Sequence, residues 1–324
     1  MRIAITGAAG FIGQKLVQRF TDNPVVATPD GEQTVTELRL FDVVDAPVPA
    51  ATDLTVHTHV GDITDEADLQ TLFAGGVDAV IHLAAVVSSA AEADLDLGLR
   101  VNLDGTRAVL EACRAMPVPP LFLFASSVAV YGGELPGVVR DDTALTPQSS
   151  YGAQKVIGEQ LINDFSRRGI IDGRVLRLPT IAVRPGKPNA AASSFASSII
   201  REPLQGDEAA LPVPEDLAVY LLSPRGVVRN LVHALSIPAE RFGGSRSLML
   251  PGITVTVAEM LAALERAGGA AARARVRAQP DPRIEAIVGS WPAAFDTAKA
   301  DRLGFSADRD MDAIVAAFIE DDSK

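Results

Sequence analysis

The stretch that decides the fold is TGAAGFIG, residues 6–13, near the start of the chain. It follows the apolar run RIAIT (residues 2–6) and leads into an amphipathic pattern over residues 11–21. This order predicts a buried strand, a glycine-rich turn and a helix.

Each glycine of this turn has a separate use. Gly7 suits a tight turn, Gly10 lets the backbone approach a phosphate, and Gly13 lets the helix pack closely on the sheet. Phe11 and Ile12 lie in the first helical turn, where backbone N–H groups and the helix dipole attract an anion. We therefore expect a dinucleotide-binding site formed by Gly7, Gly10, Phe11, Ile12 and Gly13.

Outward from this turn, short apolar runs alternate with segments of helical periodicity. The alternation predicts an α/β fold with a doubly wound parallel sheet of the Rossmann type. The expected strands are residues 2–6, 37–43, 54–60, 78–84, 121–126 and 173–178, and the expected helices between them are residues 11–21, 66–75, 97–115 and 150–168.

The regular alternation stops after about Pro179, where proline and glycine become frequent. We expect a Rossmann domain for NAD over residues 1–180. Residues 181–324 are then mainly a smaller, substrate-binding lobe, possibly interleaved with the first. Its expected helices lie around residues 191–201, 225–237, 256–267 and 309–321, and Trp291 is expected to pack inside it.

Composition limits the classes of partner. The 324 residues are 48% hydrophobic and carry a net charge of −12, which disfavours nucleic acid or an anionic membrane as the main partner. The single cysteine, Cys113, fits a reducing compartment and a core position.

No charged leader or membrane-length apolar run is present, so we expect a cytoplasmic protein. His57 and His59 share one side of a strand but have no third ligand, so we expect no metal site.

The end of the second predicted strand indicates which dinucleotide is bound. Asp42 can accept hydrogen bonds from ribose hydroxyls and would repel a 2′-phosphate, which favours NAD over NADP. The interval from Gly13 to Asp42 is long, so Asp45 stays open as a lesser candidate. Arg39 lies in mid-strand and is expected to be an exposed cation.

A second group of residues can carry proton transfer. Tyr151 and Lys155 are four apart in a predicted helix, so their side chains share a face. A neighbouring ammonium, together with the positive nicotinamide, favours the phenolate and makes Tyr151 a usable base near neutrality. Ser127 ends the fifth strand and can orient the same substrate oxygen.

Together these motifs resemble the extended short-chain dehydrogenase/reductase family. The resemblance is carried by the glycine turn, by GDI (residues 61–63), HLAA (residues 82–85) and Asn102, and by Ser127 with the Tyr151/Lys155 pair. It implies a homodimer whose interface uses the helices that contain Asn102 and Tyr151. It also implies cofactor contacts from Asp62 and Ile63 at the adenine, from Ala84, Ala85 and Pro179, from Lys155 at the nicotinamide ribose, and from Asn102 in the proton-relay and structural shell.

The residues after the Rossmann domain indicate the class of substrate. Dehydratases of the family place an acidic pair after the serine, whereas Ser127 is followed by Val128 and Ala129, so that class is disfavoured. The stretch RPGKPNAAASSF, residues 184–195, offers cation, amide and hydroxyl donors for a compact carboxylate. These are Arg184, Lys187, Asn189 and Ser193.

Several alternatives remain open for these positions. The stretch could be a solvated proline-rich loop with Asn189 as a helix cap. Arg225 is a second candidate for the carboxylate, and Ser88 or Ser89 could contact other hydroxyls or cap a loop.

Residues 197–213 and 221–235 are similar to NAD-dependent dehydrogenases of four-carbon sugar acids such as D-erythronate. This resemblance implies oxidation of the C2 hydroxyl, with Tyr151 as base while the nicotinamide accepts a hydride. A nucleotide-sugar 4-epimerase that retains NAD is the alternative enzyme. A non-catalytic NAD sensor is a third possibility, and the intact Ser127, Tyr151 and Lys155 argue against it.

Overall fold

The computed structural model describes residues 1–50, 52–186 and 192–322. Its centre is a seven-stranded parallel sheet in the order β12-β8-β7-β6-β1-β4-β5. The predicted doubly wound α/β fold is confirmed. The strands are β1 (Arg2–Thr6), β4 (Glu37–Asp42), β5 (Thr55–Val60), β6 (Ala79–His82), β7 (Leu121–Ser127), β8 (Asp172–Leu178) and β12 (Ser247–Met249).

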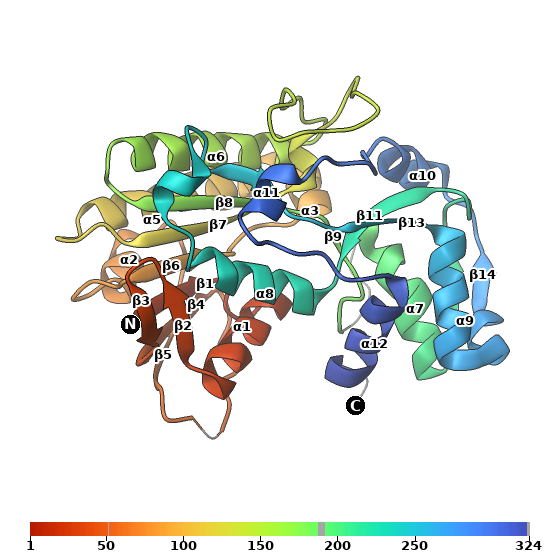
Figure 1. Ribbon diagram of the computed structural model, residues 1–324, viewed down its shortest axis with the longest axis horizontal. Coiled ribbons are helices and arrows are strands. Elements are labelled where there is room, and N and C mark those ends of the chain that lie inside the picture. Colours follow the sequence, from red (N-terminus) through yellow and green to blue (C-terminus); the bar gives the residue numbers. More distant parts are fainter. Residues whose placement is uncertain (51, 187–191, 323–324) are drawn as a thin grey trace.

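Helices cover both faces of the sheet, with α1 (Phe11–Asp22) and α8 (Pro224–Ala234) on one side and α5 (Thr106–Arg114) and α6 (Ser150–Arg167) on the other (Figure 1). Strand alternation explains this arrangement, because successive side chains point to opposite faces. On β4, Leu40 packs into the α1/α8 core and Phe41 into the α5/α6 core. The helix α2 (Glu66–Leu72) also packs in the α5/α6 layer.

The long interval between Gly13 and Asp42 contains a hairpin of β2 (Val25–Thr28) and β3 (Gly31–Thr34). It is an insertion between α1 and β4, so the second strand of the Rossmann pattern is β4. The helix expected over residues 97–115 also differs in detail. It consists of α4 (Leu95–Gly98), a π-helical segment over Leu99–Gly105, and α5; the short α3 (Ser88–Ala93) precedes it.

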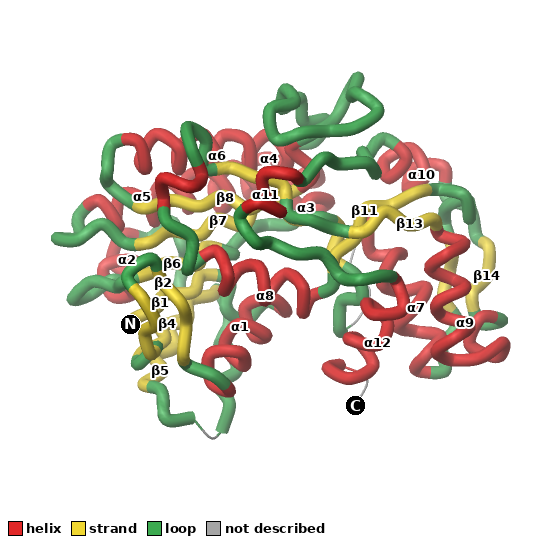
Figure 2. Tube along the Cα trace, viewed as in Figure 1, coloured by secondary structure: helices red, strands yellow, loops and turns green. Residues whose placement is uncertain are grey.

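The second lobe combines short strands with helices (Figure 2). Its strands form a three-stranded sheet, β13-β11-β9, and a two-stranded sheet, β10-β14. A separate hydrophobic core joins them to the helices. The elements are β9 (Thr180–Ile181), α7 (Phe195–Gln205), β10 (Ala209–Leu211), β11 (Ala218–Leu222), β13 (Ile253–Thr256), α9 (Val257–Arg273), β14 (Val276–Ala278), α10 (Pro282–Gly289) and α12 (Met311–Asp322). The short helix α11 (Ala298–Arg302) packs instead in the core of the first lobe, through Ala300.

The chain after residue 180 also contributes to the first lobe. Helix α8 packs beside α1, and β12 pairs with β8 at one edge of the large sheet. The two lobes therefore share chain segments, and the cleft between them is framed by elements of both halves.

The single cysteine and the two histidines of β5 have structural surroundings. Cys113 is 1% exposed, and burial raises the pKa of its thiol to about 12, as expected for an inert core residue. His59 contacts Asp68 at 2.9 Å, and His57 is exposed. Over the described ranges, no three histidine, cysteine or acidic side chains are grouped as a metal site, and no helix is long and apolar enough to span a bilayer.

Candidate active site

A cavity of about 750 Å³ runs along the carboxyl ends of the sheet strands and reaches the second lobe. This edge is where open α/β sheets bind their ligands. Most of the residues expected to contact a cofactor or substrate line it. They are Gly7, Gly10, Phe11, Ile12, Gly13, Asp42, Asp62, Ile63, Ala84, Ala85, Ser88, Ser127, Tyr151, Lys155, Pro179, Arg184 and Ser193.

The glycine turn has the shape that its sequence predicts. Gly7 has φ +74°, and a Cβ there would lie 2.7 Å from the backbone nitrogen of Ala84. Helix α1 begins after Gly10, and no side chain caps its first backbone N–H groups. A Cβ on Gly13 would meet the carbonyl oxygens of Gly7 and Ala8 at under 3 Å. The turn thus packs tightly and leaves helix N–H groups for an anion.

Asp42 ends β4 at the same edge. One carboxylate oxygen accepts from the backbone N–H of Ala9 at 2.9 Å, and the other accepts from that of Val43 at 2.7 Å. These bonds hold the carboxylate against the glycine turn. Asp45 is exposed and lies outside the cavity lining. The prediction that Arg39 is an exposed cation is wrong. Its guanidinium contacts Glu37 at 2.6 Å and donates to the carbonyls of Leu72 and Ala74.

Ser127, Tyr151 and Lys155 meet on one wall of the cavity. The Ser127 hydroxyl is near the phenol of Tyr151 and acts to lower the pKa of that phenol. The Lys155 ammonium donates to the carbonyl of Ala125 at 2.9 Å and lies 5.5 Å from the centre of the Tyr151 ring. Serine, phenol and ammonium therefore lie close together at the junction of β7 and α6.

Burial dominates the titration of this group. It raises the pKa of Tyr151 to about 12, while the hydrogen bond from Ser127 acts in the lowering direction. It also lowers the pKa of Lys155 to about 8, against the opposing charge of Glu159. Desolvation disfavours both charged forms, so Lys155 by itself does not ionise Tyr151. That Lys155 and the positive nicotinamide together make Tyr151 a base near neutrality stays a prediction.

Arg184 reaches the cavity from the other lobe. Its guanidinium donates to the hydroxyl of Ser193 at 3.0 Å. Burial lowers its pKa, and the positive charge of Arg201 adds to that effect. In the parts of the chain that the structure describes, no carboxylate pairs with Arg184, whereas Arg201 pairs with Glu202 at 2.6 Å. Arg184 can therefore receive an anion in the cavity.

Residues 3–235 match the NAD dependent epimerase/dehydratase family. The chain belongs to this family. The resemblance to extended short-chain dehydrogenases/reductases is thereby confirmed, and NAD is the cofactor.

Three similar proteins extend over nearly the whole chain. The D-erythronate dehydrogenase of Cupriavidus necator is 52% identical over 321 residues, which are 99% of this chain and 98% of the relative. The D-erythronate dehydrogenase of Haemophilus influenzae is 44% identical over 322 residues, which are 99% of this chain and 100% of the relative. The solved nucleoside-diphosphate-sugar epimerase from Agrobacterium tumefaciens is 42% identical with a TM-score of 0.93, covering 99% of this chain and 94% of that one.

The cavity residues fit the cofactor of the family. The uncapped start of α1 suits its pyrophosphate and the Asp42 carboxylate suits a ribose diol. At the adenine end, Asp62 is fixed by Thr64, whose hydrogen bonds lower the pKa of the carboxyl. The buried Ile63 and the half-buried Ala84 supply apolar walls. We propose these residues as the NAD contacts.

Replacing Asp42 by asparagine tests this proposal. The change removes the charge that repels a 2′-phosphate and weakens acceptance from ribose hydroxyls, so NAD affinity should fall about tenfold while NADP binding improves. The single tryptophan, Trp291, lines the cavity, so its fluorescence can report both titrations. Asp45→Asn is the matched control and should bind NAD normally; equal effects of the two variants would reject the assignment of Asp42.

Asn102 does not line the cavity, contrary to its expected place among the cofactor contacts. It is 3% exposed. Its side chain accepts from the N–H of Val86 at 2.8 Å and donates to the carbonyl of Val86 and to Gln154. The π-helical segment that contains it turns its amide toward the loop after β6. Asn102 therefore shapes the cavity wall through Val86, in agreement with the structural part of its expected role.

The structure contradicts the prediction that Arg225 binds the substrate carboxylate. It lies at the start of α8, is exposed, and contacts Asp321 at 2.6 Å and Glu320 at 2.9 Å. These acidic residues of α12 already neutralise it outside the cavity. Lys187 and Asn189 lie outside the described residues. Ser89 is absent from the cavity lining, whereas Ser88 is part of it.

Several residues that line the cavity were not predicted from the sequence. Trp291 was assigned to the interior of the small lobe; it does pack against that core, but it also lines the cavity. Arg100, Thr180 and Ile181 line the cavity as well. Only Thr180 and Ile181 had a usable signal, because they directly follow a strand that ends at this edge. Trp291 comes from a distant segment that no local pattern connects to the site.

Proposed function

We propose that the protein oxidises the C2 hydroxyl of D-erythronate with NAD, giving the 2-oxo acid and NADH. The observation that carries the proposal is that the Ser127/Tyr151/Lys155 group and Arg184 line the same cavity. An alcohol-oxidising group and a carboxylate receptor are thus combined in one site. The two relatives at 52% and 44% identity, both D-erythronate dehydrogenases, support this substrate.

The chain's own residues bind and orient the sugar acid. Arg184, with the Ser193 hydroxyl that it holds, receives the carboxylate. Ser127 hydrogen-bonds the C2 hydroxyl and aims it at Tyr151. Ser88, which begins α3 after β6, contacts a remaining hydroxyl.

Proton transfer then falls to Tyr151. When held by the residues of this cavity, NAD would supply the hydride acceptor for C2 and a positive charge at this end of the cavity. In its ionised form Tyr151 takes the proton of the C2 hydroxyl. Lys155 stabilises the phenolate from beneath, since its ammonium is held by the Ala125 carbonyl. Because burial alone raises the pKa of the phenol, all of these positive charges are needed.

A nucleotide-sugar epimerase is the second candidate, because the solved relative at 42% identity carries that description. The same serine, tyrosine and lysine would serve both reactions. The two differ in net redox change, since an epimerase regenerates its NAD while a dehydrogenase releases NADH. Arg184 suits a carboxylate or a diphosphate, so the dehydrogenase is favoured by the two relatives at 52% and 44% identity.

One assay separates the two reactions. The purified protein is incubated with excess NAD and either D-erythronate, other four- to six-carbon aldonates, or nucleotide sugars. We expect NADH to accumulate in many turnovers per protein with D-erythronate. Isomerised nucleotide sugar without net NADH would establish the epimerase instead, and neither product would reject both functions.

We also propose a homodimer and a cytoplasmic location. Ile157 on α6 is 40% exposed although it is a large apolar residue, which supports an interface that includes this helix. The buried, unpaired Cys113 suits a reducing compartment. Light scattering on the purified chain, whose mass is 34.0 kDa, distinguishes a dimer from a monomer.

A further inference from the structure

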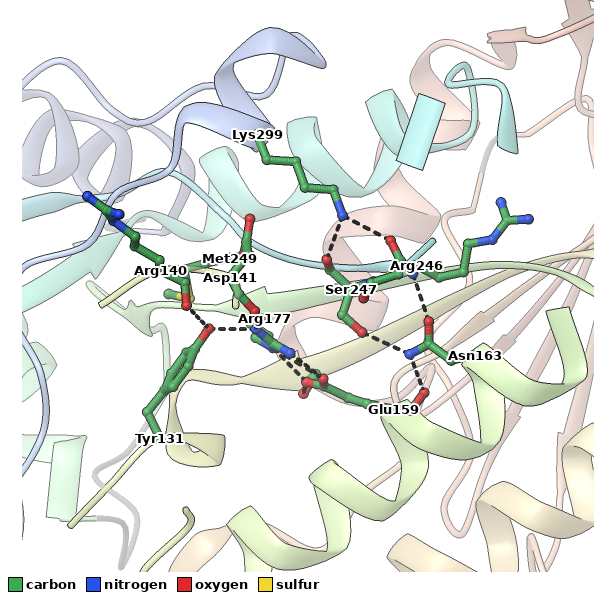
Figure 3. A network of polar contacts seen from close by, with 12 residues as sticks. Tyr131, Arg140, Asp141, Glu159, Asn163, Arg177, Arg246, Ser247, Met249 and Lys299 are labelled. Carbon is green, nitrogen blue, oxygen red and sulfur yellow. Dashed lines mark hydrogen bonds and ion pairs between the residues drawn. The ribbon is translucent and has the colours of Figure 1, made fainter. Parts of the chain in front are cut away.

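A buried ion pair lies directly behind the catalytic group. Glu159 on α6 is 0% exposed and Arg177 on β8 is 4% exposed. The guanidinium donates to both carboxylate oxygens of Glu159, at 2.7 Å from Nη2 and at 3.0 and 3.2 Å from Nε. Figure 3 shows Arg177 between Glu159 and Tyr131, whose hydroxyl it contacts at 2.5 Å. A fully buried carboxylate of this kind is rigidly held.

Glu159 shares a helix face with the catalytic residues. Tyr151, Lys155 and Glu159 follow one another at intervals of four, so they form a row along α6 that faces the sheet. Lys155 is 3% exposed. The row starts at the cavity with Tyr151 and ends at the ion pair with Glu159, and Lys155 lies between the two.

Three successive residues of β7 fix this row from the other side. The carbonyl of Ala125 accepts from Lys155 and the hydroxyl of Ser126 donates to Glu159 at 2.5 Å, while Ser127 lies near Tyr151. The strand and the helix are thus joined at each step of the row. A displacement of Glu159 would therefore also shift Lys155 on the helix and Ser126 on the strand.

The groups around Lys155 differ in charge, and Glu159 is the one that can stabilise its ammonium. On β6, His82 is neutral, since burial and the charge of Lys155 lower its pKa to about 3. On α6, Tyr151 is protonated at neutral pH. Arg177 on β8 is cationic and faces Glu159. Glu159 is therefore the anion that counters the desolvation of the Lys155 ammonium.

We propose that Glu159 is a positioning residue for the reaction, which keeps the Lys155 ammonium charged and in place beneath Tyr151. Its role in turnover rests on the proposed function. Its electrostatic role can be measured without any substrate. Arg177 and Ser126 hold the carboxylate of Glu159 at the end of the row, and Tyr131 holds Arg177.

The direct test is a titration of Lys155 in Glu159→Gln. The chain has five lysines, so ¹³Cε-lysine spectra of the full-length protein are simple, and Lys155→Met identifies the signal. Removing the buried negative charge should move the Lys155 titration to lower pH by about one unit. The alkaline limb of kcat/KM should move in the same direction, so that activity above this limb is lost about tenfold.

Asn163→Ala is the matched control. Asn163 lies one turn further along α6, donates to the Glu159 carbonyl at 2.7 Å and to Ser247 at 3.2 Å, and carries no charge. Its loss should lower thermal stability without moving the Lys155 titration. If Glu159→Gln leaves Arg177 uncompensated and does not fold, the double variant Glu159→Gln/Arg177→Met removes both charges. Its downward shift should be smaller than that of Glu159→Gln, because loss of the Arg177 cation acts in the opposite direction on the Lys155 pKa.

An unchanged Lys155 titration in a folded Glu159 variant overturns the proposal. A shifted titration in a protein that does not oxidise D-erythronate overturns the proposed function alone. The two failures are thus distinguishable, because the spectra need neither substrate nor turnover.

Discussion

Tyr151→Phe is expected to lower kcat for D-erythronate about a thousandfold, since general acid–base catalysis contributes about 10²- to 10⁴-fold. The substitution removes only the hydroxyl that accepts the substrate proton. The ring remains on α6, with Lys155 beside it. The measurement is the initial rate of NADH formation at saturating substrate.

The protein offers a control for the loss of a buried phenol. Of the three tyrosines, Tyr220 lies on β11, accepts from the N–H of Gly252 at 2.6 Å and donates to Leu250 at 3.2 Å, away from the cavity. Tyr220→Phe should cost stability and leave kcat nearly unchanged. NAD binding to Tyr151→Phe, followed by Trp291 fluorescence, should be close to normal. Near wild-type turnover by a folded Tyr151→Phe would show that another group is the base.

Arg184→Ala should raise the KM for D-erythronate about a hundredfold, a loss of about 2.7 kcal/mol that is typical of a charge-assisted hydrogen bond. The guanidinium is half-buried and no carboxylate among the described residues pairs with it, so the substrate anion is its natural partner. The effect on kcat should be smaller, because the carboxylate is not the reacting group. The kinetics of D-erythronate oxidation give both constants.

Arg225→Ala is the matched control for a lost arginine. Arg225 is exposed and bound to Glu320 and Asp321, so its removal should leave KM unchanged. An unchanged KM in Arg184→Ala would reject the carboxylate site, and a raised KM in Arg225→Ala would reinstate the residue that the structure places outside the cavity.

The local pattern was sufficient for the central elements. Strand and helix periods, and the glycine turn after β1, depend on residues close in sequence, so β1, α1, β4 and α6 could be predicted with nearly correct ends. The Tyr151/Lys155 pair also follows from helix geometry alone. The hairpin of β2 and β3 could not be predicted from the sequence pattern, because its strands are short and β3 is exposed.

The site beyond these motifs depends on contacts between distant segments. Trp291 enters the cavity from between α10 and α11, and Arg225 is withdrawn from it by α12, which lies almost a hundred residues away in sequence. Neither position can be derived from neighbouring residues, since docking of the second lobe decides both.

The sequence by itself determined the Rossmann sheet, the cofactor turn and the candidates for proton transfer, because these follow from periodicity and short spacing. Only the tertiary structure decided the ionisation of those residues. Burial at the junction of β7 and α6 raises the pKa of Tyr151 and lowers that of Lys155. The compensating carboxylate, Glu159, is held by Arg177 from another strand. Desolvation depends on everything packed around a charge, and a linear pattern contains no record of that packing.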